Sequence, residues 1–118
     1  MENTGYKNLK VYSKSHQLVL LVYKITKKFP AEELFGLVSQ MRRCAISVVA
    51  NIVEGYARRT PKDKLQFYYI SRASLTELEY YIDLSHDLDY TSEEEYADLQ
   101  LLRIEVGKLL NGFIRFTK

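Results

Sequence analysis

Apolar residues recur every three or four positions along most of this chain, which is the spacing of one face of an α-helix. The first such stripe, in segment 11–29, is formed by Val11, Ser15, Leu18, Val22, Ile25 and Phe29. A later stripe, in segment 61–88, should consist of Phe67, Ile70, Ser74, Leu78, Tyr81 and Leu88, widened by Leu75 and Ile82. The most regular stripe is formed by Leu99, Leu102, Val106, Leu109, Phe113 and Phe116. No stretch alternates with period two for long enough to predict a strand, so the pattern indicates an all-α protein.

Proline and capping residues divide this pattern into four helices. Pro30 should end the first helix, because its ring removes a backbone donor and clashes with the preceding turn. Thr60 with Pro61 is typical of a helix start, and Ser92 with Glu95 matches a capping box. The predicted helices cover about 11–29, 37–57, 61–88 and 92–116. Long helices with short connections favour an antiparallel up-down-up-down four-helix bundle, which forms a single domain over residues 1–118.

The segment 38–60 carries two patterns at once. Its apolar residues define one helical face, formed by Val38, Ala45, Val49, Ile52 and Tyr56. Its polar residues follow the same steps on a second face and end at Arg58. We interpret this polar stripe, with one residue of the next helix, as a structural network or oligomer interface formed by Gln40, Arg43, Ser47, Asn51, Glu54 and Glu77. Within it we expect Glu54 to pair with Arg43, while the stripe could lie inside the bundle, between subunits or in solvent.

Charge is distributed unevenly along the chain, although the formal net charge is only +2. Residues 1–72 contain thirteen Lys or Arg and five Asp or Glu, whereas residues 73–118 contain four and ten. The basic half could face an anionic partner, or it could meet the acidic half of a neighbouring subunit. Cations neutralise phosphates, and interleaved tyrosines can stack on bases. The candidate nucleic-acid-binding residues are Arg42, Arg58, Arg59, Lys62, Lys64 and Arg72, with Tyr56, Tyr68 and Tyr69 among them.

Catalytic and metal-binding patterns are sparse. One acidic cluster with a histidine, formed by Glu79, Asp83, His86 and Asp87, lacks the second histidine motif of a di-iron bundle. Cys44 has no partner base, and it shares a helical face with Leu37, Met41 and Val48, which predicts a small core residue. The sequence has no glycine-rich phosphate loop, G-x-S-x-G elbow or Cys-x-x-Cys pair. We therefore predict a non-enzymatic protein with no metal, no cofactor and no small-molecule substrate.

The sequence also bears on the compartment. Its longest apolar run, residues 18–22, is too short to cross a bilayer. The first ten residues, MENTGYKNLK, lack the apolar core of a signal peptide, and a single cysteine fits a reducing compartment. We expect a cytoplasmic protein without a membrane partner.

Several stretches together resemble a known family. SQMRRCAISVVANIVEGYARRT and FYYISRASLTELEYYI, with YKNLKVY, KKFP and ELFGLVSQ, are similar to the signature of a bacterial four-helix-bundle family. That family is named for proteins encoded within intervening sequences of 23S rRNA genes. The matched positions are Gln40, Arg42, Arg43, Asn51, Glu54, Gly55, Arg58, Arg72, Ser74 and Glu77.

The resemblance implies an antiparallel bundle that assembles as a ring-like homopentamer, and it implies no catalytic role. The family is similar to accessory variability determinant proteins of diversity-generating retroelements, which engage a reverse transcriptase and nucleic acid through a basic surface. RNA, DNA or such a nucleic-acid enzyme are therefore the partners that the resemblance implies. Two functions stay open on the sequence. One is a homo-oligomeric bundle associated with nucleic acid or ribonucleoprotein, and the alternative is a structural or protein-interaction module that acts as an oligomeric adaptor.

Overall fold

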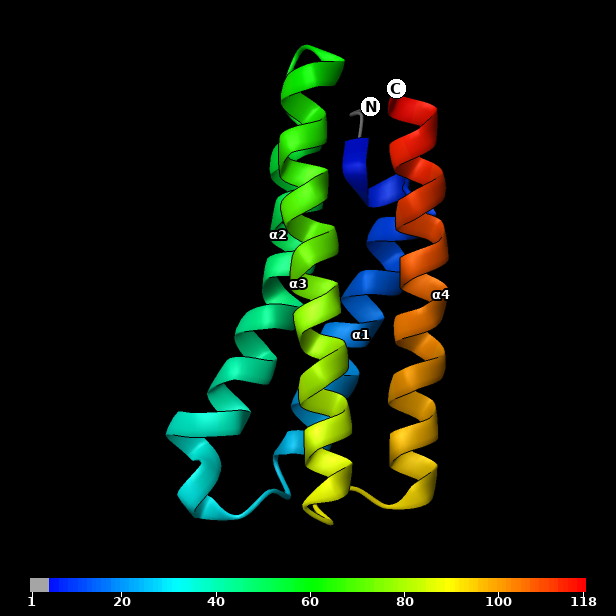
Figure 1. Ribbon diagram of the computed structural model, residues 1–118. Coiled ribbons are helices and arrows are strands. Elements are labelled where there is room, and N and C mark those ends of the chain that lie inside the picture. Colours follow the sequence, from blue (N-terminus) through cyan, green and yellow to red (C-terminus); the bar gives the residue numbers. More distant parts are fainter. Residues whose placement is uncertain (1–4) are drawn as a thin grey trace.

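The computed structural model describes residues 5–118, in which four long helices contain most of the chain (Figure 1). These helices are α1 (Lys10–Thr26), α2 (Ser39–Tyr56), α3 (Pro61–Asp87) and α4 (Glu93–Thr117). Three short helical turns complete the structure, namely η1 (Gly5–Asn8), η2 (Ala31–Glu33) and η3 (Leu34–Val38). The described range contains no strand, which confirms the all-α prediction. Residues 1–4 of the predicted domain lie outside the described residues.

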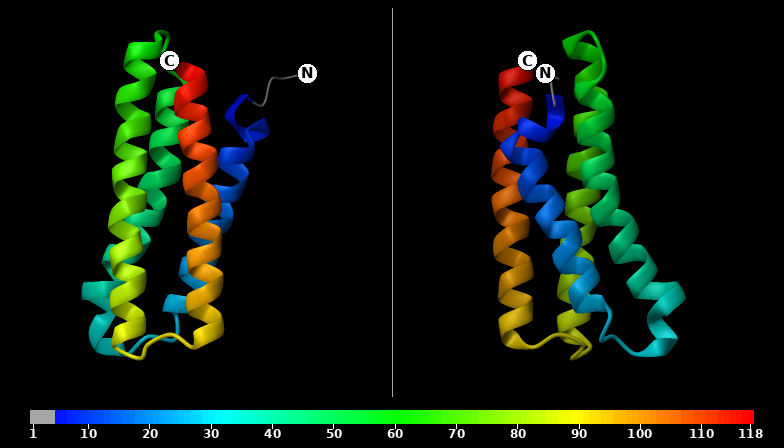
Figure 2. Two further views of the ribbon diagram at one scale, coloured as in Figure 1. Left: turned by 45° about the vertical axis from the view of Figure 1, so that its right-hand side comes forward. Right: turned by 180° about the vertical axis from the view of Figure 1, so that it is seen from behind.

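The connections lie at two opposite ends of the molecule, whose longest dimension is 43 Å. The turn between α2 and α3 shares one end with the start of α1 and the end of α4, and we call this the terminal end (Figure 1). The α1–α2 and α3–α4 connections share the other end, which we call the loop end (Figure 1). Toward the loop end, α2 leans away from the other helices (Figure 2).

The capping residues set the predicted starts of α3 and α4. The Thr60 hydroxyl accepts a hydrogen bond from the backbone N–H of Asp63 at 3.1 Å, and Pro61 is the first residue of α3. Ser92 and Glu95 form a reciprocal capping box, with hydrogen bonds of 2.9 and 3.0 Å. Both boundaries that the sequence predicted are confirmed to within one residue.

The first two helices differ from their predicted bounds. Helix α1 ends at Thr26 and not at 29. The helical conformation is disfavoured for Phe29 because it precedes Pro30, and the residues before it form a tighter turn. Two short-range backbone hydrogen bonds, from Lys28 to Ile25 and from Phe29 to Thr26, close this turn. Regular α2 starts at Ser39 and not at 37, because the preceding η3 has a wider π-type turn with non-helical dihedrals at Gly36.

The core contains the whole predicted stripe of α1, but the stripes of α3 and α4 are shifted. On α3, Ile70 is exposed, and three residues outside the predicted stripe are buried, namely Tyr68, Ser71 and Ser85. Leu88 is also exposed. Hydrophobicity alone missed the serines, which let α3 approach α2 closely. On α4 the buried positions move to Leu110 and Ile114, because a straight helix drifts by about 20° per heptad.

Candidate nucleic-acid interface

The fold converts the charge asymmetry of the sequence into a difference between the two ends of the bundle. The segments at the terminal end, residues 5–10, 54–64 and 111–118, contain eight Lys or Arg and two Asp or Glu. The segments at the loop end, residues 24–43 and 83–98, contain five and nine. A phosphate-bearing ligand is therefore attracted to the terminal end and repelled from the loop end.

Two cations of the α2–α3 turn are free to meet a ligand. Arg59 and Lys62 are exposed, and neither forms a side-chain hydrogen bond or ion pair with any residue from 5 to 118. Their neighbours are engaged within the protein. Arg58 donates to Glu54 Oε1 at 3.2 Å and lies 4.6 Å from the ring centre of Phe67. Lys64 Nζ donates to the backbone carbonyl of Tyr56 at 2.8 Å.

The other two predicted nucleic-acid contacts lie away from this turn. Arg72 is further along α3, where it donates to Asn111 Oδ1 of α4 at 3.2 Å. Arg42 lies in the α1–α2 contact near the loop end, where Nε donates to Thr26 Oγ1 at 3.0 Å and the guanidinium covers the ring of Tyr23. The sequence alone could not show that Arg42 and Arg72 lie apart from the turn, because successive residues of one helix face different neighbouring elements. Four of the six residues thus lie together at the turn between α2 and α3, which we call the basic turn: Arg58, Arg59, Lys62 and Lys64.

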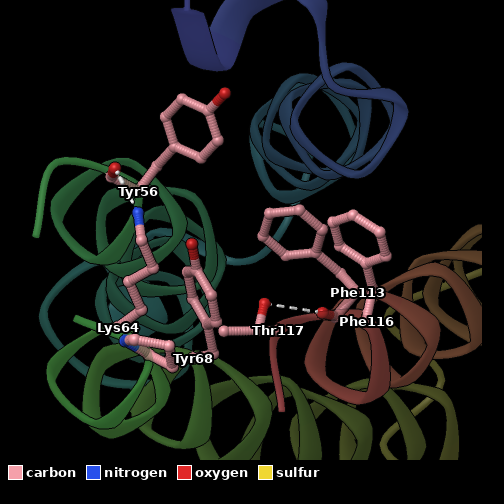
Figure 3. A pocket seen from close by; sticks show the side chains of 7 residues that line it. Tyr56, Lys64, Tyr68, Phe113, Phe116 and Thr117 are labelled. Carbon is pink, nitrogen blue, oxygen red and sulfur yellow. Dashed lines mark hydrogen bonds between the residues drawn. The ribbon is translucent and has the colours of Figure 1, made fainter. Parts of the chain in front are cut away.

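A small aromatic pocket opens beside this basic turn, between α2, α3 and the end of α4 (Figure 3). Its volume is about 220 Å³, and it is lined by Tyr56, Pro61, Lys64, Tyr68, Phe113, Phe116 and Thr117. The sequence placed Phe113 and Phe116 in the core stripe of the last helix. Phe116 is in fact 86% exposed, so its periodic spacing concealed a surface position.

Tyr68 carries a buried polar atom without a partner. Its side chain is fully buried, and its hydroxyl makes no hydrogen bond to any residue in the range 5–118. Burial raises the pKa of Tyr68 to about 12, with a smaller contribution from nearby Tyr56. The ring lies against Gly55, where a Cβ atom would come within 2.6 Å of it. Only glycine therefore allows α2 to pass this close to Tyr68.

The predicted polar network forms on the seam between α2 and α3, in two separate groups. In the first, Arg43 donates to Glu77 Oε2 at 2.6 Å and to Gln40 Oε1 at 3.0 Å. The Tyr81 hydroxyl also donates to Glu77 Oε2, at 2.9 Å. This hydrogen bond, together with the charge of Arg43, holds the pKa of Glu77 below its ordinary value. The group lies partly in solvent, since the Arg43 and Glu77 side chains are 51% and 41% exposed.

The second group is built from small side chains nearer the middle of the seam. The hydroxyls of Ser47 and Ser74 lie 2.8 Å apart, and Asn51 Nδ2 donates to the backbone carbonyl and hydroxyl of Ser47. Glu54 belongs to neither group, because it bonds to Arg58. The expected Arg43–Glu54 pair is therefore wrong, since eleven residues of helix separate the two by about 16 Å.

Cys44 is a core thiol, as its helical face predicted. It is fully buried together with Leu37, Met41 and Val48. Burial raises its pKa to about 12, and the nearby Arg43 guanidinium, 3.4 Å from the sulfur, offsets this only in part. Burial and a raised pKa both favour the neutral thiol, which is a poor nucleophile.

The acidic cluster near the end of α3 makes structural contacts. Asp83 accepts hydrogen bonds from the Tyr96 hydroxyl at 2.7 Å and from Gln100 at 2.9 Å. His86 contacts Thr91 and Glu93 and stacks on Tyr96. Across residues 5–118, no group of three or more His, Cys, Asp or Glu side chains is placed to hold a metal ion. Nor does any helix in this range combine the length and hydrophobicity that a membrane crossing requires.

The fold and the basic turn together define a small all-α bundle protein with one positively charged end. The chain belongs to the family of 23S rRNA-intervening sequence proteins, whose model matches residues 7–112. It is similar to a protein of unknown function from the S23 ribosomal protein family of Bacteroides thetaiotaomicron VPI-5482, which has a crystal structure. The two chains share 25% identity and a TM-score of 0.82, over 89% of this chain and 95% of that one. No curated protein sequence matches the chain. The family membership confirms the resemblance read from the sequence motifs.

Proposed function

We propose that this chain is a non-enzymatic, antiparallel up-down-up-down bundle that binds nucleic acid or ribonucleoprotein through its terminal end and works as a homo-oligomer. The observation that carries the proposal is that Arg59 and Lys62 have no partner among residues 5–118 and lie on a turn whose surroundings are strongly basic. The alternation of the connections between the two ends supports the antiparallel order of the helices (Figure 1).

A cation binds phosphate most favourably when it does not first have to break an interaction within the protein. Arg59 and Lys62 have no internal partner among residues 5–118 that a phosphate would have to displace. Each phosphate that they neutralise releases condensed counterions, so affinity should fall steeply with salt. The start of α3 adds the partial positive charge of a helix N-terminus at the same turn, which the Asp63 carboxylate in the first turn offsets in part.

The test is binding of fluorescein-labelled RNA and DNA, measured by anisotropy across a salt series. The double variant Arg59→Ala/Lys62→Ala should bind more weakly, and its salt slope should fall by about 0.7–0.9 for each lost phosphate contact. The matched control is Lys24→Ala/Lys27→Ala, which removes the same charge from the loop end and should bind like the parent protein. Absence of binding at low salt, or equal weakening in both variants, would refute the proposal.

Self-association is supported by apolar side chains on the surface of α1, α2 and η3. Phe35 is 91% exposed, and Leu20, Leu34 and Ile46 are each at least 44% exposed. Phe35, Leu34 and Ile46 border one groove with Tyr23. Exposed apolar surface of this kind is typical of protein interfaces. The homopentamer is what the resemblance implied, and an oligomeric adaptor that binds only protein would use the same face.

Light scattering on a sizing column tests this part of the proposal. The parent protein should elute as an assembly of about five chains, and Phe35→Glu should shift it to smaller species because a charge at the interface is costly to desolvate. Phe116→Glu is the matched control, since Phe116 is similarly exposed at the other end of the bundle. A parent protein that is a monomer at micromolar concentration contradicts self-association. An intact assembly that binds no nucleic acid would favour the adaptor.

A further inference from the structure

We infer that the aromatic pocket at the terminal end receives a single unpaired base, so that the protein prefers single-stranded nucleic acid to duplex. This inference rests on the proposed nucleic-acid binding and assigns it a specific site. The pocket lies directly beside the basic turn, because Lys64 and Pro61 belong both to the start of α3 and to the pocket wall (Figure 3).

The ring geometry suits a planar ligand. Tyr56 and Phe113 have ring centres 6.5 Å apart with planes inclined by 26°, and Tyr68 lies 4.9 Å from Phe113 at 51°. The exposed ring of Phe116 is at the rim and provides a free face. Bases of a single strand stack on such rings whatever their sequence, because every base has a π-face.

The Tyr68 hydroxyl supplies the polar contact that distinguishes a base from an apolar group. It is the only buried side-chain N or O atom within residues 5–118 that lacks a hydrogen-bond partner. Figure 3 shows it directed toward the space between Tyr56 and Phe113. Two neighbouring polar groups are already engaged, since Lys64 Nζ donates to the backbone carbonyl of Tyr56 and the Thr117 hydroxyl donates to the backbone carbonyl of Phe113. A base edge offers carbonyl and ring-nitrogen acceptors to this hydroxyl, whereas an aliphatic or phenyl side chain would leave it unsatisfied.

Size and charge agree with the same ligand. The pocket volume of about 220 Å³ lies below the range of about 300–1,000 Å³ that drug-sized ligands occupy, so it suits one ring system. The exposed cations of the adjoining turn, Arg59 and Lys62, lie within two residues of Pro61 in the pocket wall and can meet the phosphates that flank an inserted base. Paired bases in a duplex cannot enter without unstacking, which is why recognition of this kind targets single strands.

Two variants test the pocket without disturbing the basic turn. Phe116→Ala removes an exposed ring and should weaken binding of a short single-stranded RNA about tenfold, in line with loss of one base–aromatic stack. Tyr68→Phe removes only the unpartnered hydroxyl and should weaken it several-fold, while thermal stability stays equal or rises. Binding of a duplex of the same length should be unchanged in both. Tyr80→Ala, which removes an exposed ring of α3 outside the pocket, is the control and should bind like the parent.

A second measurement locates the contact directly. Iodouracil placed in the single strand should photocrosslink to a pocket aromatic, either Tyr56 or Phe116, as identified by peptide mass spectrometry. Parent-like single-strand binding in both pocket variants, or equal loss on single strand and duplex, overturns the pocket assignment. If Arg59→Ala/Lys62→Ala still weakens binding in that case, the basic end stands and only the pocket is refuted. If the parent protein binds neither form, both inferences fail together.

Discussion

The contact between Gly55 and Tyr68 makes a prediction whose size can be worked from the structure. In Gly55→Ala the new Cβ would lie 2.6 Å from a ring carbon of Tyr68 and 2.9 Å from Cβ of Phe67, where ordinary contact is 3.4–4 Å. Neither neighbour can easily withdraw, because Tyr68 is fully buried against Phe113 and the Phe67 atom is fixed to the α3 backbone.

Two free-energy terms oppose each other in this variant. Overpacking a closely fitted site costs about 1–3 kcal/mol. Replacing a helical glycine with alanine gains up to about 1 kcal/mol. With the full gain subtracted, we expect Gly55→Ala to lower the free energy of unfolding by up to about 2 kcal/mol, which corresponds to as much as about 8 °C in Tm for a domain of this size.

Gly112→Ala is the matched control. Gly112 also lies within a helix, but a Cβ atom there would meet only the flexible side chain of Arg115, at 3.8 Å. This variant should gain stability by up to about 1 kcal/mol, so the difference between the two variants reports the overpacking alone. Circular dichroism melts and urea titrations of both provide the measurement. A Gly55→Ala protein as stable as Gly112→Ala would refute the close approach of α2 and α3.

The seam and the core give two further predictions. Glu77→Ala should cost about 1 kcal/mol in a urea titration, because it unpairs Arg43 and Tyr81, whereas Glu54→Ala should change stability by less than about 0.5 kcal/mol. Because the pKa of Glu77 is lowered in the folded state, its carboxylate stabilises the fold at pH values above the ordinary Glu pKa of about 4.3. This stabilisation is lost as the pH falls through the folded-state pKa. Glu77→Gln should therefore flatten the acid limb of the pH–stability curve. Cys44 should resist iodoacetamide at neutral pH in the folded protein and react after denaturation, because it is buried with its pKa raised to about 12; rapid labelling of the native protein would contradict this.

The sequence predicted helices and caps well because those depend on local chemistry. Thr60 and Ser92 act through residues three positions away, so a single sequence contains all that is needed to place them. The face of α3 was predicted less well, because its inward side is decided by α2. Ser71 is buried since its hydroxyl can donate to the carbonyl of Val48 across the seam at 2.7 Å, a partner that periodicity cannot identify.

The same distinction between local chemistry and contacts between helices applies to the candidate site. The exposure of Arg59 and Lys62 could be predicted from sequence, because they lie at the turn between two helices, where charged side chains have few neighbours. The sequence included Glu77 in the network with Arg43 but favoured Glu54 as its partner, because periodicity within one helix does not show that Glu77, thirty-four positions away, lies across the seam. The pocket was also hidden, since it needs residues from α2, α3 and α4 to meet at one end.

The close approach of α2 and α3 connects stability to the proposed site. Gly55 sets the position of the Tyr68 ring, and Tyr68 in turn forms part of the pocket wall beside the basic turn. A Cβ at position 55 would therefore push the ring toward the space that we assign to a base. It follows that Gly55→Ala should weaken single-strand binding more than duplex binding, even at temperatures where the variant is fully folded. Gly112→Ala should leave both unchanged, because its Cβ would meet only the side chain of Arg115 and no pocket residue. If the two folded variants bind single strands equally well, the packing of α2 against α3 at Gly55 does not affect base binding in the pocket, and this prediction is wrong.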